Sequence, residues 1–356
     1  MSPNRAPALR LPLVVLVALT LVTVACGDDQ TTAQRAEAST TVTGVDELAP
    51  VPPEPSAGCA DPEPVEAESV ETITVDGAEW QYQRHVPAAH DGVEPVPMVV
   101  DFHGYSEGAG VHAVHTALGP FGDEQGFVTI TPQGQGPVPL WNLDEDAGDL
   151  TFVDQLLDAE EAALCVDLNR VYATGLSNGA FMTSAVACAL EGRVAAVAPV
   201  AGIRDLEGCE LDRPVPVVAF HGTEDRFISY DGGLGPSVGD LPSPDGSGRS
   251  LAEEGQLPEE AEIATGGSVP AQTAGWAARN GCDPEPTETA VADDVTLVEF
   301  TCPDDATTQL YRVDGGGHSW PGSDFSVTIE SVVGPTTFSI DANELMWAFF
   351  EEHPRR

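Results

Sequence analysis

Short apolar runs recur along the chain between residues 98 and 313, separated by polar or glycine-rich turns. Several are rich in valine with few polar interruptions, which is typical of strands buried on both faces of a sheet. We predict strands at Met98–Phe102, Phe127–Thr131, Arg170–Thr174, Val194–Ala198, Pro216–Phe220 and Gln309–Val313.

Helical patterns lie between these strands. Phe152–Leu164 carries apolar residues on one helical face, and Ala271–Asn280 and Asn343–Glu352 are two further candidates. Strands that alternate with helices favour a parallel sheet covered on both faces. The predicted class is therefore α/β, with a mostly parallel central sheet and helices on both sides.

Two segments interrupt this alternation. Glu71–Val75 and Trp80–His85 flank the turn signal Asp76-Gly77 and predict a hairpin. Residues 231–268 hold nine glycines and little apolar clustering, so we predict an insertion of either of two kinds. It is a lid segment or a disordered excursion, and the composition favours the excursion.

The N-terminal segment predicts export. Arg5 and Arg10 precede an apolar stretch from Leu11 to Ala25, so residues 1–25 are interpreted as a signal peptide. The sequence Thr23-Val24-Ala25-Cys26 is similar to a bacterial lipobox, which predicts lipidation of Cys26; plain secretion stays open. Residues 26–69, rich in Pro, Thr and acidic side chains, are predicted to be a disordered linker, and residues 70–356 the catalytic domain.

Charge and cysteine content narrow the possible partners and location. The net charge is −44 and all 14 basic residues are arginine, so nucleic acid and anionic membrane surfaces are poor partners, because like charges repel. A membrane contact is expected only through the lipid anchor. The seven cysteines leave six besides Cys26, and an even number in an exported chain predicts disulfides. We predict one bridge, Cys282 to Cys302, and leave the other pairings open.

The most informative motif is Gly175-Leu176-Ser177-Asn178-Gly179. A predicted strand precedes it and a helix-like run follows it, which is the context of a nucleophile elbow. Three histidine motifs follow other strands: His103-Gly104, His221-Gly222-Thr223-Glu224-Asp225 and Gly316-Gly317-His318. The order Ser, Asp, His along the chain is the order of α/β-hydrolases.

Together these pieces resemble the polyhydroxybutyrate depolymerase and feruloyl esterase group, relatives of carbohydrate esterase family 1 in the α/β-hydrolase superfamily. The matching segments lie between about residues 70 and 352 and include residues 99–104, 131–134, 164–167, 170–179, 221–225, 280–282 and 316–322. The resemblance implies an α/β-hydrolase fold. It also implies cleavage of carboxylic esters through an acyl-enzyme.

The expected catalytic residues follow from these motifs. Ser177 is the expected nucleophile, His318 its general base and Asp225 the acid that orients the base, with Glu224 as the alternative acid. The backbone amides of Asn178 and Tyr105 are expected to form the oxyanion hole. Trp141 and Trp320 are predicted to line the substrate site. No metal or cofactor is expected.

Four other histidines receive structural interpretations. His103 and His221 end strands and are predicted to make structural hydrogen bonds rather than act as bases. His112 and His115 have the H-x-x-H spacing of a metal site, but no completing acid is evident nearby, so a solvated helix face is predicted.

The favoured hypothesis is a secreted or lipid-anchored serine ester hydrolase acting on hydroxyacyl, feruloyl or acetyl esters of oligomers or polysaccharides. A serine peptidase on the same fold and a non-catalytic ligand-binding lipoprotein are the alternatives. All three predicted triad residues being present argues against the last.

Overall fold

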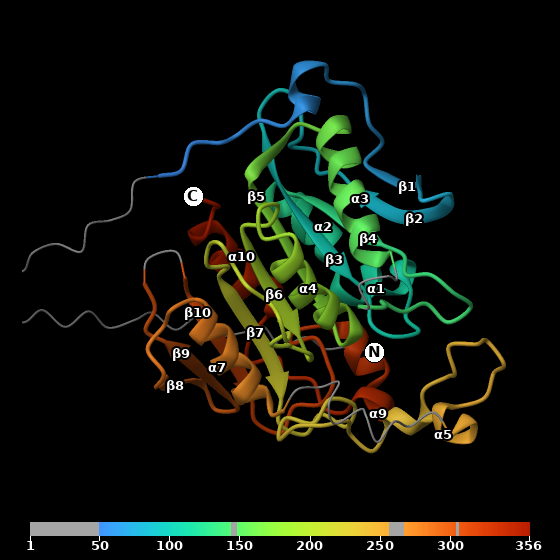
Figure 1. The fold of residues 1–356 in the computed structure, drawn as a ribbon, viewed down its shortest axis with the longest axis vertical. Coiled ribbons are helices and arrows are strands. Elements are labelled where there is room, and N and C mark those ends of the chain that lie inside the picture. Colours follow the sequence, from blue (N-terminus) through green and yellow to red (C-terminus); the bar gives the residue numbers. More distant parts are fainter. Residues whose placement is uncertain (1–49, 144–147, 256–266, 304–305) are drawn as a thin grey trace, which may run out of the picture. The chain divides into compact units, whose positions relative to one another are not determined.

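The computed structural model describes residues 50–143, 148–255, 267–303 and 306–356. Pro50–Arg356 forms one compact unit. Its centre is a ten-stranded sheet in the order β1-β2-β4-β3-β5-β6-β7-β10-β9-β8 (Figure 1). The strands are β1 (Glu68–Val75), β2 (Ala78–His85), β3 (Val96–Phe102), β4 (Val128–Pro132), β5 (Val166–Leu176), β6 (Ala196–Val200), β7 (Val217–Gly222), β8 (Thr287–Ala292), β9 (Val295–Phe300) and β10 (Thr308–Val313).

The middle of the sheet is parallel and its two ends are antiparallel hairpins. Strands β4, β3, β5, β6, β7 and β10 run parallel, whereas β1 pairs with β2, and β9 with β8 and β10, in antiparallel register. The predicted strands and the Asp76-Gly77 hairpin are confirmed. The β8–β9 hairpin is additional; β8 is largely exposed and therefore lacks the continuous apolar run of the central strands.

Helices cover both faces of the sheet (Figure 1). Alternate residues of one strand serve the two sides: Val217 belongs to one core cluster and Val218 to the other. The first cluster includes side chains of α3 (Asp149–Ala163), α4 (Asn178–Ala189) and α7 (Val269–Arg279). The second includes α2 (Leu118–Gln125) and α10 (Ala342–Glu352). The remaining helices are η1 (Ala57–Ala60), α1 (Ala109–Thr116), η2 (Val238–Asp240), α5 (Leu251–Glu254), α8 (Asp324–Thr328) and α9 (Glu330–Val333).

The predicted linker was wrong in its C-terminal part. Residues from Pro50 onward belong to the folded unit, and Cys59 is disulfide-bonded to Cys165. The Ser56 hydroxyl donates to the Leu164 carbonyl over 2.6 Å, and the Ser56 N–H to Val166 over 2.9 Å. Covalent and hydrogen-bonded attachment thus orders a segment whose composition alone predicts disorder. The predicted signal peptide, residues 1–25, and Cys26 lie outside the described residues.

The interpretation of 231–268 as a disordered excursion was wrong where the structure describes this insertion, at 231–255 and 267–268. Bridges join Ile228 to Leu234 and Pro242 to Ser250, and a capping box of Ser250 and Glu253 begins α5. The few apolar residues of the segment matter more than its glycines, because they cover the cavity described below. Residues 256–266 lie outside the described part.

Two further disulfides lie within the domain. Cys282 is bonded to Cys302, which confirms that predicted pairing, and Cys188 is bonded to Cys209. Within the described ranges, the structure holds no helix with the length and hydropathy needed to cross a bilayer.

Candidate active site

Ser177 occupies the sharp turn between β5 and α4. Its backbone has φ 60° and ψ −117°, a conformation that costs a non-glycine residue strain and that recurs at functional turns. The flanking glycines are required by contact. A Cβ on Gly179 would lie 2.0 Å from the Phe102 carbonyl oxygen, and one on Gly175 would lie 2.6 Å from the same atom. The motif therefore folds as a nucleophile elbow, as its context predicts.

Asp225 and His318 meet at the same edge of the sheet. Asp225 follows β7 and His318 follows β10, and the carboxyl ends of parallel strands gather there. His318 Nδ1 donates to Asp225 Oδ2 over 2.7 Å, and both side chains are buried. Glu224, the alternative acid, is exposed. The geometry thus favours Asp225 as the partner of His318.

The Asp225 carboxylate is held on all sides. Its Oδ1 accepts the N–H groups of Phe227 (2.8 Å) and Ile228 (2.9 Å). Burial by itself raises the pKa of this carboxyl, but the attraction of His318 and hydrogen bonds from His221 and His318 hold the pKa well below its ordinary value. The group is therefore an anion that can fix and stabilise a histidine.

Ser177 and His318 line one apolar cavity of about 430 Å³. The two side chains make no hydrogen bond to each other, a contact that in serine hydrolases often tightens only with substrate bound. The apolar lining comes mostly from α4, the loop after β7, the insertion and α8–α9, with single residues from the end of β5 and from α1. Besides Val111 and Leu176, it comprises Phe181, Phe227, Ile228, Leu234, Val238, Leu241, Leu251, Phe325, Ile329, Val332 and Val333; of all these, the sequence analysis named only Leu176, as part of the elbow motif.

Tyr105 and Asn178 also line this cavity. Among the described residues, the backbone N–H of Tyr105 has no hydrogen-bond acceptor, although the amides on either side of it do: Gly104 donates to Glu107 and Ser106 to Pro139. The Tyr105 hydroxyl donates to the Pro242 carbonyl over 2.8 Å, which ties this loop to the insertion. Both expected oxyanion residues therefore stand beside Ser177.

No protein-family model matches this chain. Feruloyl esterase B of Piromyces equi is 27% identical over 247 residues, which are 65% of this chain and 41% of that protein. Feruloyl esterase D of Neurospora crassa is 26% identical over 227 residues, 57% of this chain and 76% of that protein. The bifunctional acetylxylan esterase/xylanase XynS20E of Neocallimastix patriciarum is 27% identical over 146 residues, 41% of this chain and 22% of that protein.

Feruloyl and acetylxylan esterases are thus among the known proteins to which this chain is similar. It spans about two fifths of the length of feruloyl esterase B and about a fifth of XynS20E. Among solved structures, acetyl xylan esterase from Aspergillus awamori superposes with a TM-score of 0.50 at 16% identity, covering 74% of this chain and 98% of that one. This likeness shows the α/β-hydrolase fold.

The two tryptophans predicted to line the substrate site do not. Trp141 and Trp320 are 2% and 1% exposed and are absent from the cavity wall. Trp141 donates its ring N–H to the His103 carbonyl, and Trp320 to the Asn343 side chain, both over 2.9 Å. Trp141 supports the site indirectly, through Asn178. The Trp141 backbone N–H donates to Asn178 Oδ1, and Asn178 Nδ2 donates to the Trp141 carbonyl oxygen. Their aromatic bulk is used for packing.

His103, just after β3, and His221, near the end of β7, have the structural roles predicted for them. His103 Nδ1 donates to the Gly104 carbonyl and its Nε2 accepts from the Gly134 N–H. Burial lowers the pKa of His103 to about 4, consistent with a neutral ring. His221 Nε2 donates to the Ile228 carbonyl and lies 3.3 Å from Asp225 Oδ2.

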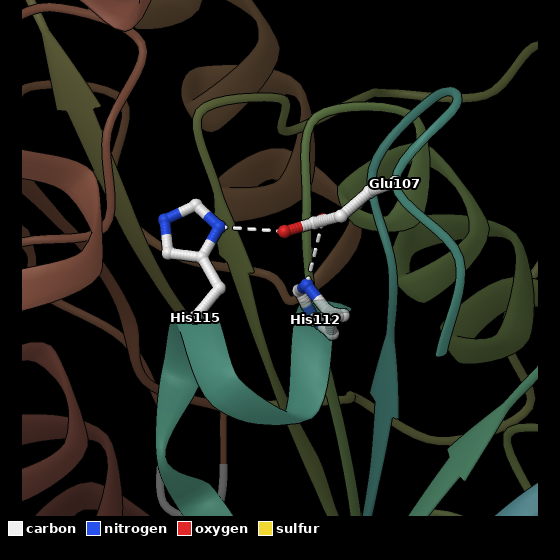
Figure 2. Close-up of side chains that lie close together, drawn as sticks. All are labelled: Glu107, His112 and His115. Carbon is white, nitrogen blue, oxygen red and sulfur yellow. Dashed lines mark hydrogen bonds and ion pairs between the residues drawn. The ribbon is translucent and has the colours of Figure 1, made fainter. Parts of the chain in front are cut away.

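The prediction of a solvated face for His112 and His115 was wrong. Both rings are buried, at 0% and 3% exposure, and both hydrogen-bond to Glu107 (Figure 2). The missing acid lay five residues before His112, across the loop that leads into α1. The spacing Glu107-x₄-His112-x₂-His115 was the available signal.

Proposed function

We propose that this chain is a serine carboxylic-ester hydrolase that works through an acyl-enzyme intermediate. The single observation that carries the proposal is Ser177 at a strained elbow, sharing a cavity with a histidine whose Nδ1 is bonded to buried Asp225. The homology with feruloyl and acetylxylan esterases supports the same reaction class.

The mechanism follows from the roles that this geometry supports. The Ser177 hydroxyl attacks the ester carbonyl while His318 Nε2 takes its proton, and the Asp225 carboxylate stabilises the resulting imidazolium. The oxyanion is held by the amides of Asn178 and Tyr105. His318 then returns the proton to the departing alcohol. Water, activated by His318 in the same way, cleaves the acyl-enzyme and frees the acid.

The lining of the cavity indicates which acyl group is preferred. Its walls are aromatic and aliphatic, and burying apolar substrate surface there is favourable by about 25 cal/mol per Å². A feruloyl ring or a hydroxyacyl chain gains more from such walls than an acetyl group does. We infer that the preferred ester carries an aromatic or medium-length acyl group on an oligomer or polysaccharide alcohol.

A substrate panel tests this proposal. Purified protein is assayed with methyl ferulate, p-nitrophenyl esters of increasing length, hydroxybutyrate oligomers and acetylated xylan, beside Ser177→Ala. We expect Ser177-dependent hydrolysis with kcat/KM highest on methyl ferulate or a medium-length acyl ester. Labelling of Ser177 by a fluorophosphonate gives a second readout. An unlabelled Ser177 and no hydrolysis of any ester would contradict the proposed function.

We also propose that the protein is exported and held on the outer face of the cell membrane through lipid on Cys26. The N-terminal sequence supports this, and the three disulfides of the domain are consistent with an oxidising compartment.

A further inference from the structure

A buried chain of hydrogen-bonded polar groups runs from β3 to α8 beside the cavity. Asp101 Oδ1 lies 2.8 Å from His112 Nε2, and His112 Nδ1 lies 2.9 Å from Glu107 Oε2. Glu107 Oε1 lies 2.6 Å from His115 Nδ1, whose other nitrogen contacts the Ser326 hydroxyl at 2.7 Å. Figure 2 shows Glu107 between the two rings.

The three residues Glu107, His112 and His115 are of types that also bind metal ions. Their distances fit hydrogen bonds better. Tetrahedral zinc, at about 2.0–2.1 Å from each ligand atom, separates neighbouring ligand atoms by about 3.3 Å. The carboxylate oxygens of Glu107 lie only 2.6 and 2.9 Å from the two ring nitrogens, one oxygen to each ring, so a proton fits in each gap.

Charge balance also favours hydrogen bonds over a bound metal ion at this cluster. Asp101 is fully buried and the Glu107 side chain is 11% exposed, and two buried carboxylates need a cation close by. His112 lies between them. Burial alone would lower the pKa of His112, but the attraction of Asp101 and Glu107 raises it to about 10. His112 is therefore an imidazolium that donates to both carboxylates.

Glu107 connects the two buried histidines to the Gly104–Tyr105 loop beside Ser177. Its Oε2 accepts the N–H of Gly104 over 2.9 Å, and its own N–H donates to the Gly104 carbonyl over 3.2 Å. Gly104 stands against the nucleophile, since a Cβ there would lie 3.7 Å from Ser177 Cβ. The next residue is Tyr105, whose N–H is the second proposed oxyanion donor.

We propose that Glu107, clamped by His112 and His115, is a positioning residue that fixes the Gly104–Tyr105 backbone so that the Tyr105 amide faces the oxyanion. This inference rests on the proposed function. It gives His112 and His115 an indirect role in catalysis, because they hold Glu107, whose carboxylate also lines the cavity.

The test compares Glu107→Gln with Glu160→Gln. Glu160 is a matched control because it is a buried carboxylate that accepts from Tyr82 (2.6 Å) and contacts Arg84, away from the cavity. Glutamine at 107 cannot accept from both rings and from Gly104. We expect kcat to fall roughly 100-fold, the scale of one lost oxyanion donor, with KM changed less than about threefold. Affinity for phenylboronic acid, a tetrahedral mimic, should fall in parallel.

Glu107→Asp covers the case in which the first variant does not fold. It keeps the charge with a side chain one methylene shorter, so we expect about a tenfold loss in kcat. Wild-type kcat in a folded Glu107 variant, an equal loss in Glu160→Gln, or a stoichiometric metal ion bound through Glu107 would each overturn this inference alone. Wild-type protein without Ser177-dependent hydrolysis would instead overturn the proposed function.

Discussion

His318 and Asp225 are 93 residues apart in the chain and 2.7 Å apart in the fold. The contact exists because β7 and β10 are parallel neighbours in the sheet, so the loops that follow them meet. Asp225 is in turn fixed by two backbone amides of its own loop. The histidine is therefore oriented by a carboxylate that has no freedom to turn away.

This relationship predicts unequal losses on substitution. His318→Ala removes the base and should lower kcat on the order of 10⁴-fold, close to the loss in Ser177→Ala. Asp225→Asn should also be severe but leave more residual rate, because the base is still present. Glu224→Gln, its exposed neighbour, should stay within about twofold of wild type. Steady-state kinetics measure these losses, with circular dichroism as a check on folding. A larger loss of kcat in Glu224→Gln than in Asp225→Asn would show that Asp225 is not the acid of the triad.

The insertion should set acyl preference. Leu241 lines the cavity, and removing a few buried carbon atoms from a substrate pocket changes discrimination by about 1–3 kcal/mol. Leu241→Ala should lower kcat/KM for methyl ferulate roughly tenfold while changing p-nitrophenyl acetate less than about twofold. Val291→Ala, on exposed β8, is the control for loss of an apolar side chain away from the cavity. Equal effects on both esters would argue that the insertion is not part of the acyl site.

Stability at alkaline pH should depend on His112. Its folded pKa is raised from 6.5 to about 10 by Asp101 and Glu107, the carboxylates that face it, while the remaining ring neighbours are His115 and Trp320. A raised pKa contributes stability that is fully present below pH 6.5 and is lost as pH rises through about 10. The free energy of unfolding should therefore fall over this window in wild type.

Two variants isolate the contribution of His112 to the free energy of unfolding. In His112→Gln the fall between pH 6.5 and 10 should flatten, measured by urea unfolding at several pH values. His90 has the opposite sign, because burial lowers its pKa and the stability it contributes is lost as pH falls. His90→Gln should thus leave the alkaline window unchanged. A wild-type slope that persists in His112→Gln would refute the assignment.

The disulfides should contribute unequally. Cys59–Cys165 spans 106 residues and Cys282–Cys302 spans 20. In the chain-entropy model these loops stabilise by about 4.7 and about 3 kcal/mol respectively. Replacing both cysteines of the first bridge by serine should lower the denaturation midpoint more than replacing those of the second. Loss of the second should lower thermal stability before it lowers activity at room temperature. A non-reduced peptide map checks the pairings, and any different pairing or a free thiol would contradict them.

Cys26 should decide membrane attachment. A diacylated, N-acylated cysteine holds a protein firmly on a membrane, whereas one chain holds weakly. Cys26→Ser should release soluble protein or block processing, measured by fractionation and by labelling with a fatty-acid analogue. Unchanged fractionation of this variant would count against lipidation.

The sequence by itself determined what local pattern controls. The valine-rich strands, the Asp76-Gly77 hairpin and the elbow around Ser177 could be predicted because each depends on neighbours a few residues away. Asp225 and His318 could be proposed as acid and base because each follows a predicted strand within a few residues. Chain order then indicated which serine, acid and base belong together.

Only the tertiary structure decided which side chains are buried and which meet. Trp141 and Trp320 pack inside although their loops favour an open rim. His112 and His115 are buried although the valines beside them on the same helix, Val111 and Val114, are exposed. Glu107 joins the two histidines because the loop between β3 and α1 places its carboxylate against both rings, and Cys59 orders the linker by bonding to a residue 106 positions away. Burial and long-range pairing depend on how distant segments are folded together, and this information is absent from any short window of sequence.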